Sequence, residues 1–317
     1  MIITVTLNPA LDKTARVDVM KSYALNRLSE VQIDAGGKGV NVSAMIRSLG
    51  GRSITTGFAG GNTGEELLAG ISRKGLEADF VHITGNTRTN LKVIDHSGRL
   101  TELNEPGPEI KKEEWLAMEQ KLSDYGTEGA IVALSGSLPT GLDDNTYQQL
   151  SAMLRRRGAA VFLDADGNAL KYALSSSPDE IPDYIKPNRN ELLRYFDISD
   201  HDTVSEEQLV ELCQSLLNKG VKLVALSMGE IGAFFVNKNG IWRSDAIQTP
   251  IRSTVGAGDS MIGALAYGFE KRLDDEQCFA LAMAASAAAC TTKGTKAPER
   301  TLITALLSKV RLERKKR

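Results

Sequence analysis

The chain has 317 residues, a length that allows two domains or one large α/β domain with an appendage. Hydrophobic residues make up 42% and charged residues 25%, as in folded globular proteins, which excludes extensive disorder. The formal net charge of -2 gives no broad positive field for nucleic acid, so anions can only be bound locally.

Short apolar runs alternate with longer segments of helical periodicity along the chain. The runs that predict strands cover residues 2–7, 54–58, 131–134, 160–163 and 223–226. The segments that predict helices cover residues 40–49, 65–74, 111–124, 144–157, 205–218, 257–271, 275–291 and 301–310. This alternation predicts an α/β fold, with a mostly parallel sheet and helices on both of its faces.

Two stretches interrupt this alternation. Residues 14–34 and 89–104 show short alternating strands, with turn signals such as Ser97-Gly98, where helices would be expected. A small sheet cannot hide both of its faces alone. We therefore expect a β appendage that covers a site, pairs with a second copy of the chain, or does both.

Cysteines and histidines give no sign of a metal site or a disulfide framework. The three residues of each type are widely separated, which argues against a CxxC zinc site and a His-based triad. The N-terminal residues lack the basic segment of a signal peptide, and the Ala-rich run 279–290 is too short to span a bilayer. We expect a cytoplasmic protein that binds neither membranes nor nucleic acid.

Polar residues follow several of the predicted strands. In parallel sheets ligands bind at the carboxyl ends of the strands, so these residues are expected to converge on one crevice. They are Asn8, Ser135-Gly136-Ser137, Asp164-Ala165-Asp166, Lys186-Pro187-Asn188 and Ser227-Met228-Gly229.

The glycine-rich segment from Ala35 to Asn41 precedes a predicted helix. Its amides, together with Lys38 and Asn41, could hold a phosphate or sugar hydroxyls. It is not a Walker A loop, because Gly39 follows the lysine where Ser or Thr is required. The alternative is a flexible lead-in with Asn41 on the first helical turn.

Two charged residues near the predicted appendage are candidates for substrate contacts. Asp12 follows the first strand and Asn8-Pro9, where it could bind sugar hydroxyls or serve only as a turn residue. Arg88 stands at the edge of the second insertion and suits a bidentate contact with a substrate phosphate, although a surface arginine is an equal alternative.

The segment Lys186-Pro187-Asn188 is followed by Glu191, a spacing that predicts a capping box at a helix start. Alternatively, Asn188 and Glu191 lie near Mg²⁺ or its waters beside nucleotide phosphates, and both roles are compatible. Further on, Ser227-Met228-Gly229 and Gly232 form either a turn between two strands or a place where a nucleotide approaches the backbone.

The segment from Ser253 to Ser260 places two glycines and Asp259 at a predicted helix start. The free amides and the dipole of such a start favour a phosphate or a developing oxyanion. A carboxylate beside an anion suits a base that accepts a proton from an attacking hydroxyl, whereas the alternative is a loop with Asp259 as a dipole partner. Met261 stands where a dinucleotide fingerprint needs a third glycine or alanine, which disfavours a nicotinamide oxidoreductase.

Taken together, the motifs resemble those of the ribokinase-like (PfkB) carbohydrate kinases, through Gly36-Gly37-Lys38-Gly39-Val40-Asn41 and Thr254-Val255-Gly256-Ala257-Gly258-Asp259-Ser260. Within the family the chain is similar to the 1-phosphofructokinase and tagatose-6-phosphate kinase branch. The motifs that carry this narrower likeness are Asn8-Pro9-Ala10-Leu11-Asp12, Arg88-Thr89-Asn90, Asn104-Glu105-Pro106-Gly107-Pro108, Gly136-Ser137-Leu138-Pro139 and Lys186-Pro187-Asn188.

The resemblance implies a single Rossmann-like α/β/α domain over residues 1–317, with a β-sheet lid from insertions at about 12–35 and 88–105. It also implies ATP and Mg²⁺, and a homodimer formed through the lid. Asp259 would be the base, and the Gly256, Ala257 and Gly258 amides would hold the transferred phosphoryl group. Sugar-phosphate contacts would come from Asp12, Gly37, Lys38, Asn41, Arg88 and Ser137. The ATP site would be lined by Lys186, Asn188, Ser227, Gly229 and Gly232, with Glu191 tied to Mg²⁺ through water.

The implied reaction is ATP-dependent phosphorylation of a ketohexose monophosphate, with fructose 1-phosphate as the first expectation. The Gly-Gly-Lys-Gly sequence contrasts with the all-glycine form of some fructose-6-phosphate kinases of the branch and disfavours that activity. Tagatose 6-phosphate remains an alternative substrate. An alternative from another class is a sugar-phosphate sensor that kept the fold and lost catalysis.

Overall fold

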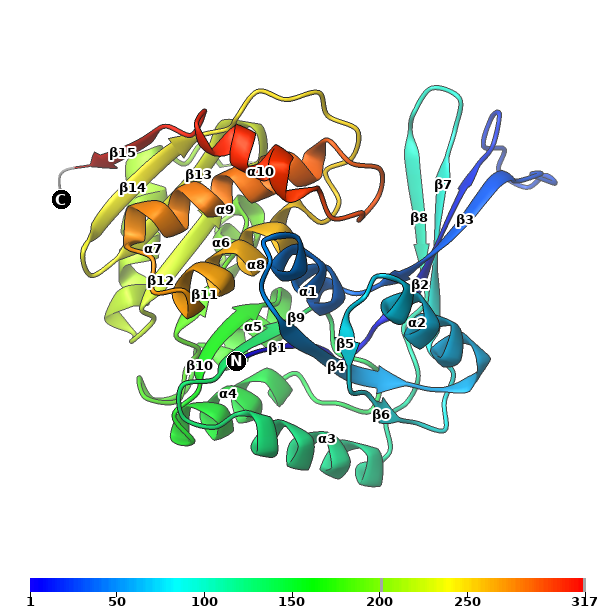
Figure 1. Ribbon diagram of the computed structural model, residues 1–317, viewed down its shortest axis with the longest axis horizontal. Helices are drawn as coiled ribbons and strands as arrows, with labels where there is room; N and C mark the ends of the chain where they lie inside the picture. Colours follow the sequence, from blue (N-terminus) through cyan, green and yellow to red (C-terminus); the bar gives the residue numbers. More distant parts are fainter. Residues whose placement is uncertain (200–201, 316–317) are drawn as a thin grey trace.

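A mixed β-sheet forms the centre of the computed structural model, which describes residues 1–199 and 202–315 (Figure 1). The strand order is β15-β14-β13-β12-β11-β10-β9-β1-β4-β5, and β6 pairs with β4. Neighbouring strands from β5 to β12 are parallel, whereas β13, β14 and β15 are antiparallel. The strands are β1 Ile2–Thr6, β4 Ser53–Ala59, β5 Glu77–Ala78, β6 Val81–His82, β9 Ile131–Ser135, β10 Ala160–Asp164, β11 Tyr184–Ile185, β12 Leu223–Ser227, β13 Gly232–Asn237, β14 Gly240–Asp245 and β15 Leu312–Lys315.

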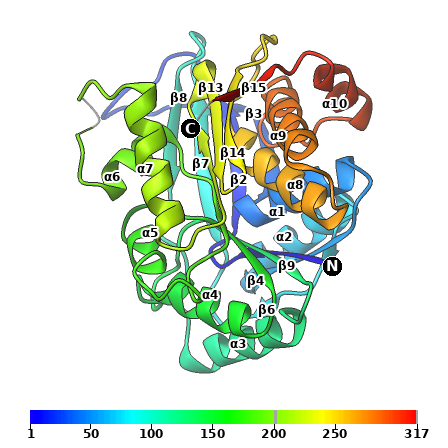
Figure 2. The ribbon, with the colours of Figure 1, turned by 90° about the vertical axis from the view of Figure 1, so that its left-hand side faces the viewer.

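Helices cover both faces of the sheet (Figure 2). One face carries α3 Lys112–Tyr125, α4 Thr146–Arg156, α5 Gly167–Ala173, α6 Arg189–Tyr195 and α7 Glu206–Asn218. The other carries α1 Lys38–Ser48, α8 Ala257–Glu270, α9 Asp275–Cys290 and α10 Arg300–Leu307. Alternate strand residues enter opposite cores, as Ile3 and Ile2 do in β1. The predicted α/β fold with helices on both faces is confirmed.

A second, four-stranded sheet stands beside this body, in the order β3-β2-β7-β8 (Figure 1). Its strands are β2 Ala10–Arg16, β3 Ser29–Gly36, β7 Arg88–Ile94 and β8 Leu100–Asn104. The helix α2 Gly61–Arg73 packs against its base, where Leu11 and Ala35 meet Leu67 and Ile71 in a small core. The strands therefore come from the two stretches that interrupt the helix–strand alternation in the sequence.

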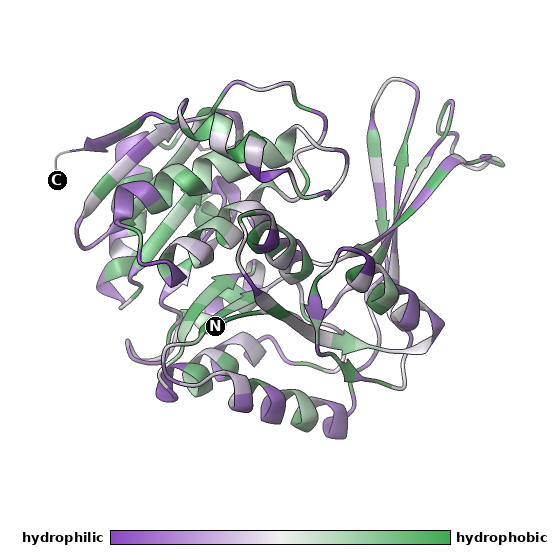
Figure 3. Cartoon of the chain, viewed as in Figure 1, coloured by the Kyte–Doolittle hydropathy of each residue, from purple (hydrophilic) through white to green (hydrophobic). Residues whose placement is uncertain are grey.

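Hydrophobic residues follow the central strands, whereas the second sheet and α3 carry many hydrophilic ones (Figure 3). No helix in residues 1–199 and 202–315 combines the length and apolar character needed to cross a lipid bilayer.

The sequence did not predict the edge strands β14 and β15, the two-residue strands β5 and β6, or two short helices. The hairpin of β13 and β14 turns at Asn237–Gly240, with Asn239-Gly240 as the turn signal that apolar periodicity alone overlooks. The helices α5 and α6 have seven residues each, which is too short for a clear helical period.

Candidate active site

Helix α8 begins with a sharp turn at Gly256, whose φ of 83° lies in the left-handed region that favours glycine. The amide of Ala257 donates a 3.4 Å hydrogen bond to the Thr254 carbonyl. Gly258 is the second residue of α8, and the amides of the first turn have no partner within the helix. Asp259 follows in this first turn and is buried. A carboxylate thus lies beside backbone amides and the positive end of a helix dipole.

The start of α1 meets the start of α8 through one hydrogen bond. Asn41 donates from Nδ2 to Oδ2 of Asp259 at 2.8 Å, and both side chains are buried. Gly37 precedes α1 with a φ of 130°, and a Cβ there would come within 2.8 Å of Thr6 Cγ2. Only glycine therefore fits at the turn before α1, where the backbone packs against Thr6, and this turn brings Asn41 to Asp259.

A buried carboxylate, Asp164, ends β10 and lies between two lysines. Lys38 Nζ is 3.4 Å from its Oδ2, and Lys186 Nζ is 3.4 Å from its Oδ1. A Cβ on Gly258 would come within 3.0 Å of Lys186 Nζ, so this ammonium lies against the first turn of α8. Segments that are far apart in the sequence thus bring two ammonium groups and two carboxylates together.

These neighbours set the protonation of the base candidate. Burial, and then the nearby Asp164, raise the pKa of Asp259 to about 6, although Asn41, Lys38 and Lys186 oppose the rise. Burial would also raise the pKa of Asp164, but the ammonium groups of Lys186 and Lys38 hold it below its usual value. Asp259 is therefore more basic than an ordinary carboxylate and still ionised at neutral pH.

Arg88, the first residue of β7 in the second sheet, forms hydrogen bonds to three segments of the chain. Its Nη2 donates to the Asn8 carbonyl at 3.0 Å and to Ser137 Oγ at 3.5 Å, and its Nη1 donates to the Glu105 carbonyl at 2.9 Å. Its Nε is buried and has no hydrogen-bond partner in the region that the structure describes. The guanidinium is thus held rigidly beside Ser137.

Asp12 lies on β2 and contacts β7 rather than the Lys38–Asp164 cluster. Its Oδ1 accepts from Asn90 Nδ2 at 3.2 Å, and its Oδ2 is 2.9 Å from Lys92 Nζ. A Cβ on Gly36 would come within 2.7 Å of its carboxyl group, so the carboxylate lies against the turn that leads into α1.

Asn188 and Glu191 form the predicted capping box at the start of α6. Asn188 Oδ1 accepts from the Glu191 amide and Glu191 Oε2 accepts from the Asn188 amide, each at 2.8 Å. The pKa of Lys38 is raised against the effect of burial, mainly by the charges of Asp164 and Asp259 and then by that of Glu191. Ser227 lies beside Asn188 in a parallel bridge, and its amide donates to the Pro187 carbonyl at 3.0 Å.

Gly229 and Gly232 stand in the turn between β12 and β13. Gly229 has a φ of 58° and open space around its Cα, whereas a Cβ on Gly232 would collide with the Ser244 carbonyl oxygen. Close packing against β14 is therefore a sufficient reason for glycine at 232, and only Gly229 faces open space.

Sequence reasoning gave no role to three residues that the structure brings into contact with the candidates. Asp164 was expected at the crevice only as a strand-end residue, because its pairing with Lys38 and Lys186 depends on distant segments. The signal for Asn90 and Lys92 was available, since they follow Arg88 at steps of two residues and so share its face of β7.

Three asparagine side chains at the site have a buried oxygen with no hydrogen-bond partner among the described residues. They are Asn8, Asn41 and Asn90, and the atom is Oδ1 in each. Buried polar groups are normally partnered, so this part of the molecule fits a ligand rich in hydroxyl groups. In residues 1–199 and 202–315 no group of three or more His, Cys, Asp or Glu side chains is arranged to hold a metal ion.

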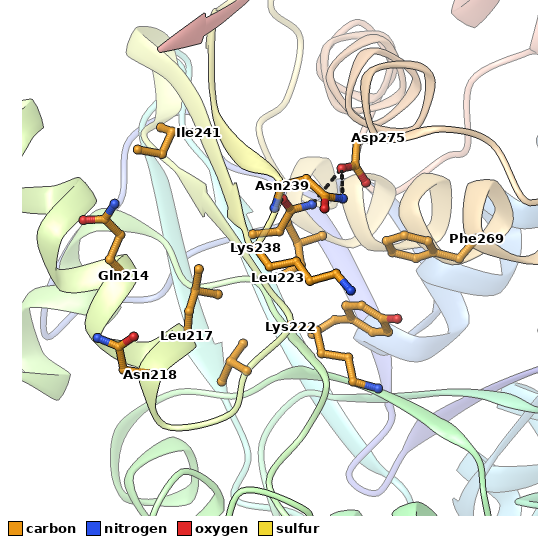
Figure 4. A pocket seen from close by; sticks show the side chains of 13 residues that line it. Gln214, Leu217, Asn218, Lys222, Leu223, Lys238, Asn239, Ile241, Phe269 and Asp275 are labelled. Atoms are coloured by element: carbon orange, nitrogen blue, oxygen red, sulfur yellow. Dashed lines mark hydrogen bonds between the residues drawn. The ribbon is translucent and has the colours of Figure 1, made fainter. Parts of the chain in front are cut away.

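A cavity of about 820 Å³ lies at the opposite end of the central sheet, where Tyr184 and Leu223 begin their strands (Figure 4). Asn239 donates to Asp275 at 2.8 Å on one of its walls, as Figure 4 shows. None of the candidate site residues lines this cavity.

Comparisons with known proteins identify relatives over nearly the whole chain. Residues 5–302 match the pfkB family carbohydrate kinase profile. A 1-phosphofructokinase of Xanthomonas campestris pv. campestris is 37% identical over 295 residues, which cover 90% of this chain and 89% of that protein. A 1-phosphofructokinase of Haemophilus influenzae is 31% identical over 312 residues, which cover 98% of this chain and 97% of that protein.

Solved structures agree with these relatives. Phosphofructokinase-2 of Escherichia coli, in complex with substrates and products, has a TM-score of 0.90 at 28% identity and covers 97% of this chain and 98% of its own. A possible 1-phosphofructokinase of Thermotoga maritima has a TM-score of 0.86 at 27% identity and covers 100% of both chains.

Proposed function

The chain belongs to the pfkB family of carbohydrate kinases, and we propose that it transfers the γ-phosphoryl group of ATP to the free primary hydroxyl of fructose 1-phosphate. The products are fructose 1,6-bisphosphate and ADP. Relatives named 1-phosphofructokinase support this substrate. The observation that carries the chemistry is the Asp259 carboxylate, held by Asn41 at the start of α8 beside Lys186.

Asp259 accepts the proton of the attacking hydroxyl. As the sugar oxygen forms its bond to the γ-phosphorus, the bond between that phosphorus and the bridging oxygen of ADP breaks, and the proton passes to the carboxylate. A pKa of about 6 suits this task, because the group is ionised at neutral pH and still basic enough to take a proton.

Positive groups around the first turn of α8 stabilise the phosphoryl group in transfer. The Gly256, Ala257 and Gly258 amides lie at the positive end of the helix dipole, and the Lys186 ammonium lies against Gly258. Such preorganised charge is what phosphoryl transfer requires most of a protein.

The sugar phosphate is held between α1 and the second sheet. Asp12, Gly37 and Asn41 bind its hydroxyl groups, and Arg88 with Ser137 and Lys38 binds its phosphate. Buried oxygens without partners on Asn8, Asn41 and Asn90 support this position for a hydroxyl-rich ligand.

ATP is bound along the far side of the crevice, by Lys186, Asn188, Ser227, Gly229 and Gly232. Mg²⁺ supplies neutralisation of the phosphate charge when it is bound. The residues present fit this ion, because Mg²⁺ takes oxygen ligands and commonly uses one or two carboxylates, water and substrate phosphates. Glu191, which uses Oε2 in the capping box, would hold the ion through water.

We also propose that the second sheet acts as a lid and pairs with the lid of a second copy. By strand register, Ile33 and Leu103 of its outer strands share one face, and each is more than 40% exposed. Apolar side chains grouped on strands at the surface favour burial against a partner.

Tagatose 6-phosphate is the alternative substrate, since it also carries an anionic phosphate at one end and a primary hydroxyl at the other. A non-catalytic sensor is disfavoured by the buried Asp259, because a protein that only binds phosphate gains nothing from a carboxylate beside it.

A coupled assay for ADP release tests the proposal by comparing kcat/KM for fructose 1-phosphate, tagatose 6-phosphate and fructose 6-phosphate. We expect fructose 1-phosphate to give the highest value. A higher value for tagatose 6-phosphate would reassign the substrate, and no ADP release with any of the three would refute the kinase function.

A further inference from the structure

The second sheet contains a largely buried ion pair between Asp12 and Lys92, and the proposed function gives Lys92 no role. Lys92 Nζ lies 2.9 Å from Asp12 Oδ2, and the exposed fractions of the two side chains are only 14% and 12%. Holding an ammonium and a carboxylate away from water is costly unless the pair is well placed. Such a pair in a small, otherwise exposed sheet therefore calls for an explanation.

The direction of the Lys92 side chain is informative. Strand register places Lys92 of β7 directly beside Thr14 of β2 and Glu102 of β8. The ammonium nevertheless pairs with Asp12, which lies two residues along β2, and not with the exposed Glu102 next to it. Lys92 thus extends along the sheet toward the crevice.

The carboxylate that it reaches is held from three directions. Asn90 donates to Oδ1 of Asp12 and Lys92 donates to Oδ2. The backbone of Gly36 lies so close to the carboxyl group that a Cβ on Gly36 would not fit. Asp12 therefore has a single orientation, against the turn that leads into α1.

We propose that Lys92 is a positioning residue for the sugar phosphate, which fixes the Asp12 carboxylate in the orientation that accepts hydrogen bonds from sugar hydroxyls. This inference rests on the proposed function, in which Asp12 binds the sugar. Lys92 acts through Asp12 and takes no part in the transfer of the phosphoryl group. Its loss affects the affinity for sugar rather than the rate of the chemical step.

The test is the variant Lys92→Met, which keeps the length of the side chain and removes its charge. We expect KM for fructose 1-phosphate to rise by about tenfold to a hundredfold, the range for loss of one charged hydrogen bond. We expect kcat and KM for ATP to stay within about twofold of the wild-type values. The reason is that the lost interaction binds the sugar equally well before and during the transfer step, so its loss changes KM for the sugar and not kcat. Lys92→Arg keeps the charge and should restore KM to within about threefold.

The matched control is Lys21→Met. Lys21 is exposed and lies in the connection between β2 and β3. This variant removes the same charge beside the same sheet without touching Asp12, and KM for fructose 1-phosphate should not change.

Calorimetric titration with fructose 1-phosphate in the absence of ATP separates this inference from the proposed function. If the wild-type chain neither binds nor phosphorylates the sugar, the proposed function fails. If it does both and Lys92→Met binds equally well, or if Lys21→Met weakens binding as much, the positioning role is refuted. If Lys92→Met does not fold, an increase of KM in Lys92→Arg beyond tenfold would refute it as well.

Discussion

Asp259 shows how neighbouring groups decide what a single carboxylate can do. An aspartate in the first turn of a helix is ordinarily a stabilising partner of the dipole and remains ionised. Here burial and the charge of Asp164 make the ionised form less favourable, whereas Asn41 and two lysines limit that effect. The result is a carboxylate that keeps its charge at neutral pH and binds a proton more readily than usual.

This arrangement predicts the pH dependence of the reaction. Because the pKa of Asp259 is raised to about 6, its protonated form accumulates below that pH and cannot accept a proton from the sugar. We expect kcat/KM for fructose 1-phosphate, which reports the free enzyme, to fall by about tenfold per pH unit well below pH 6 and to level off above it. Steady-state rates between pH 5 and about 8, with folding followed by circular dichroism in the same buffers, would check this. A constant kcat/KM down to pH 5 would contradict it.

The helices and strands around the candidate site carry their functional residues at one end of each element. Helices α1 and α8 meet at their starts, where Asn41 and Asp259 are joined at 2.8 Å. Strand β10 ends at Asp164, and β11 ends one residue before Lys186. The carboxyl ends of parallel strands and the amino ends of two helices thus meet at one edge of the sheet, where ligands bind in other open α/β sheets.

The second sheet leads to a prediction about association. If its outer strands pair with a second copy, Ile33→Glu and Leu103→Glu each place a charge in the shared surface, and we expect both variants to sediment as monomers. The control is Leu116→Glu, which changes an equally exposed leucine on α3 and should leave the dimer intact. A wild-type chain that sediments as a monomer at micromolar concentration would contradict the proposal.

For the molecule as a whole, sequence periodicity was sufficient to predict the central parallel strands, most helices and the two interruptions that form the second sheet. Local signals also predicted the capping box of Asn188 and Glu191, because both partners lie within one helical turn. Contacts between distant segments could not be predicted in this way. Asp164 meets Lys38 only because β10 and α1 reach the same crevice, and a single sequence does not contain that geometry.

The central claim is that the chain is a sugar-phosphate kinase whose base is Asp259, and the variant Asp259→Asn tests it most directly. Asparagine keeps the shape of the side chain and cannot accept the proton, so we expect kcat with fructose 1-phosphate to fall by about a hundredfold or more. Calorimetric titration should show that fructose 1-phosphate still binds to the variant within about threefold of the wild-type affinity. A variant that keeps near-normal kcat would contradict the assignment of Asp259 as the base.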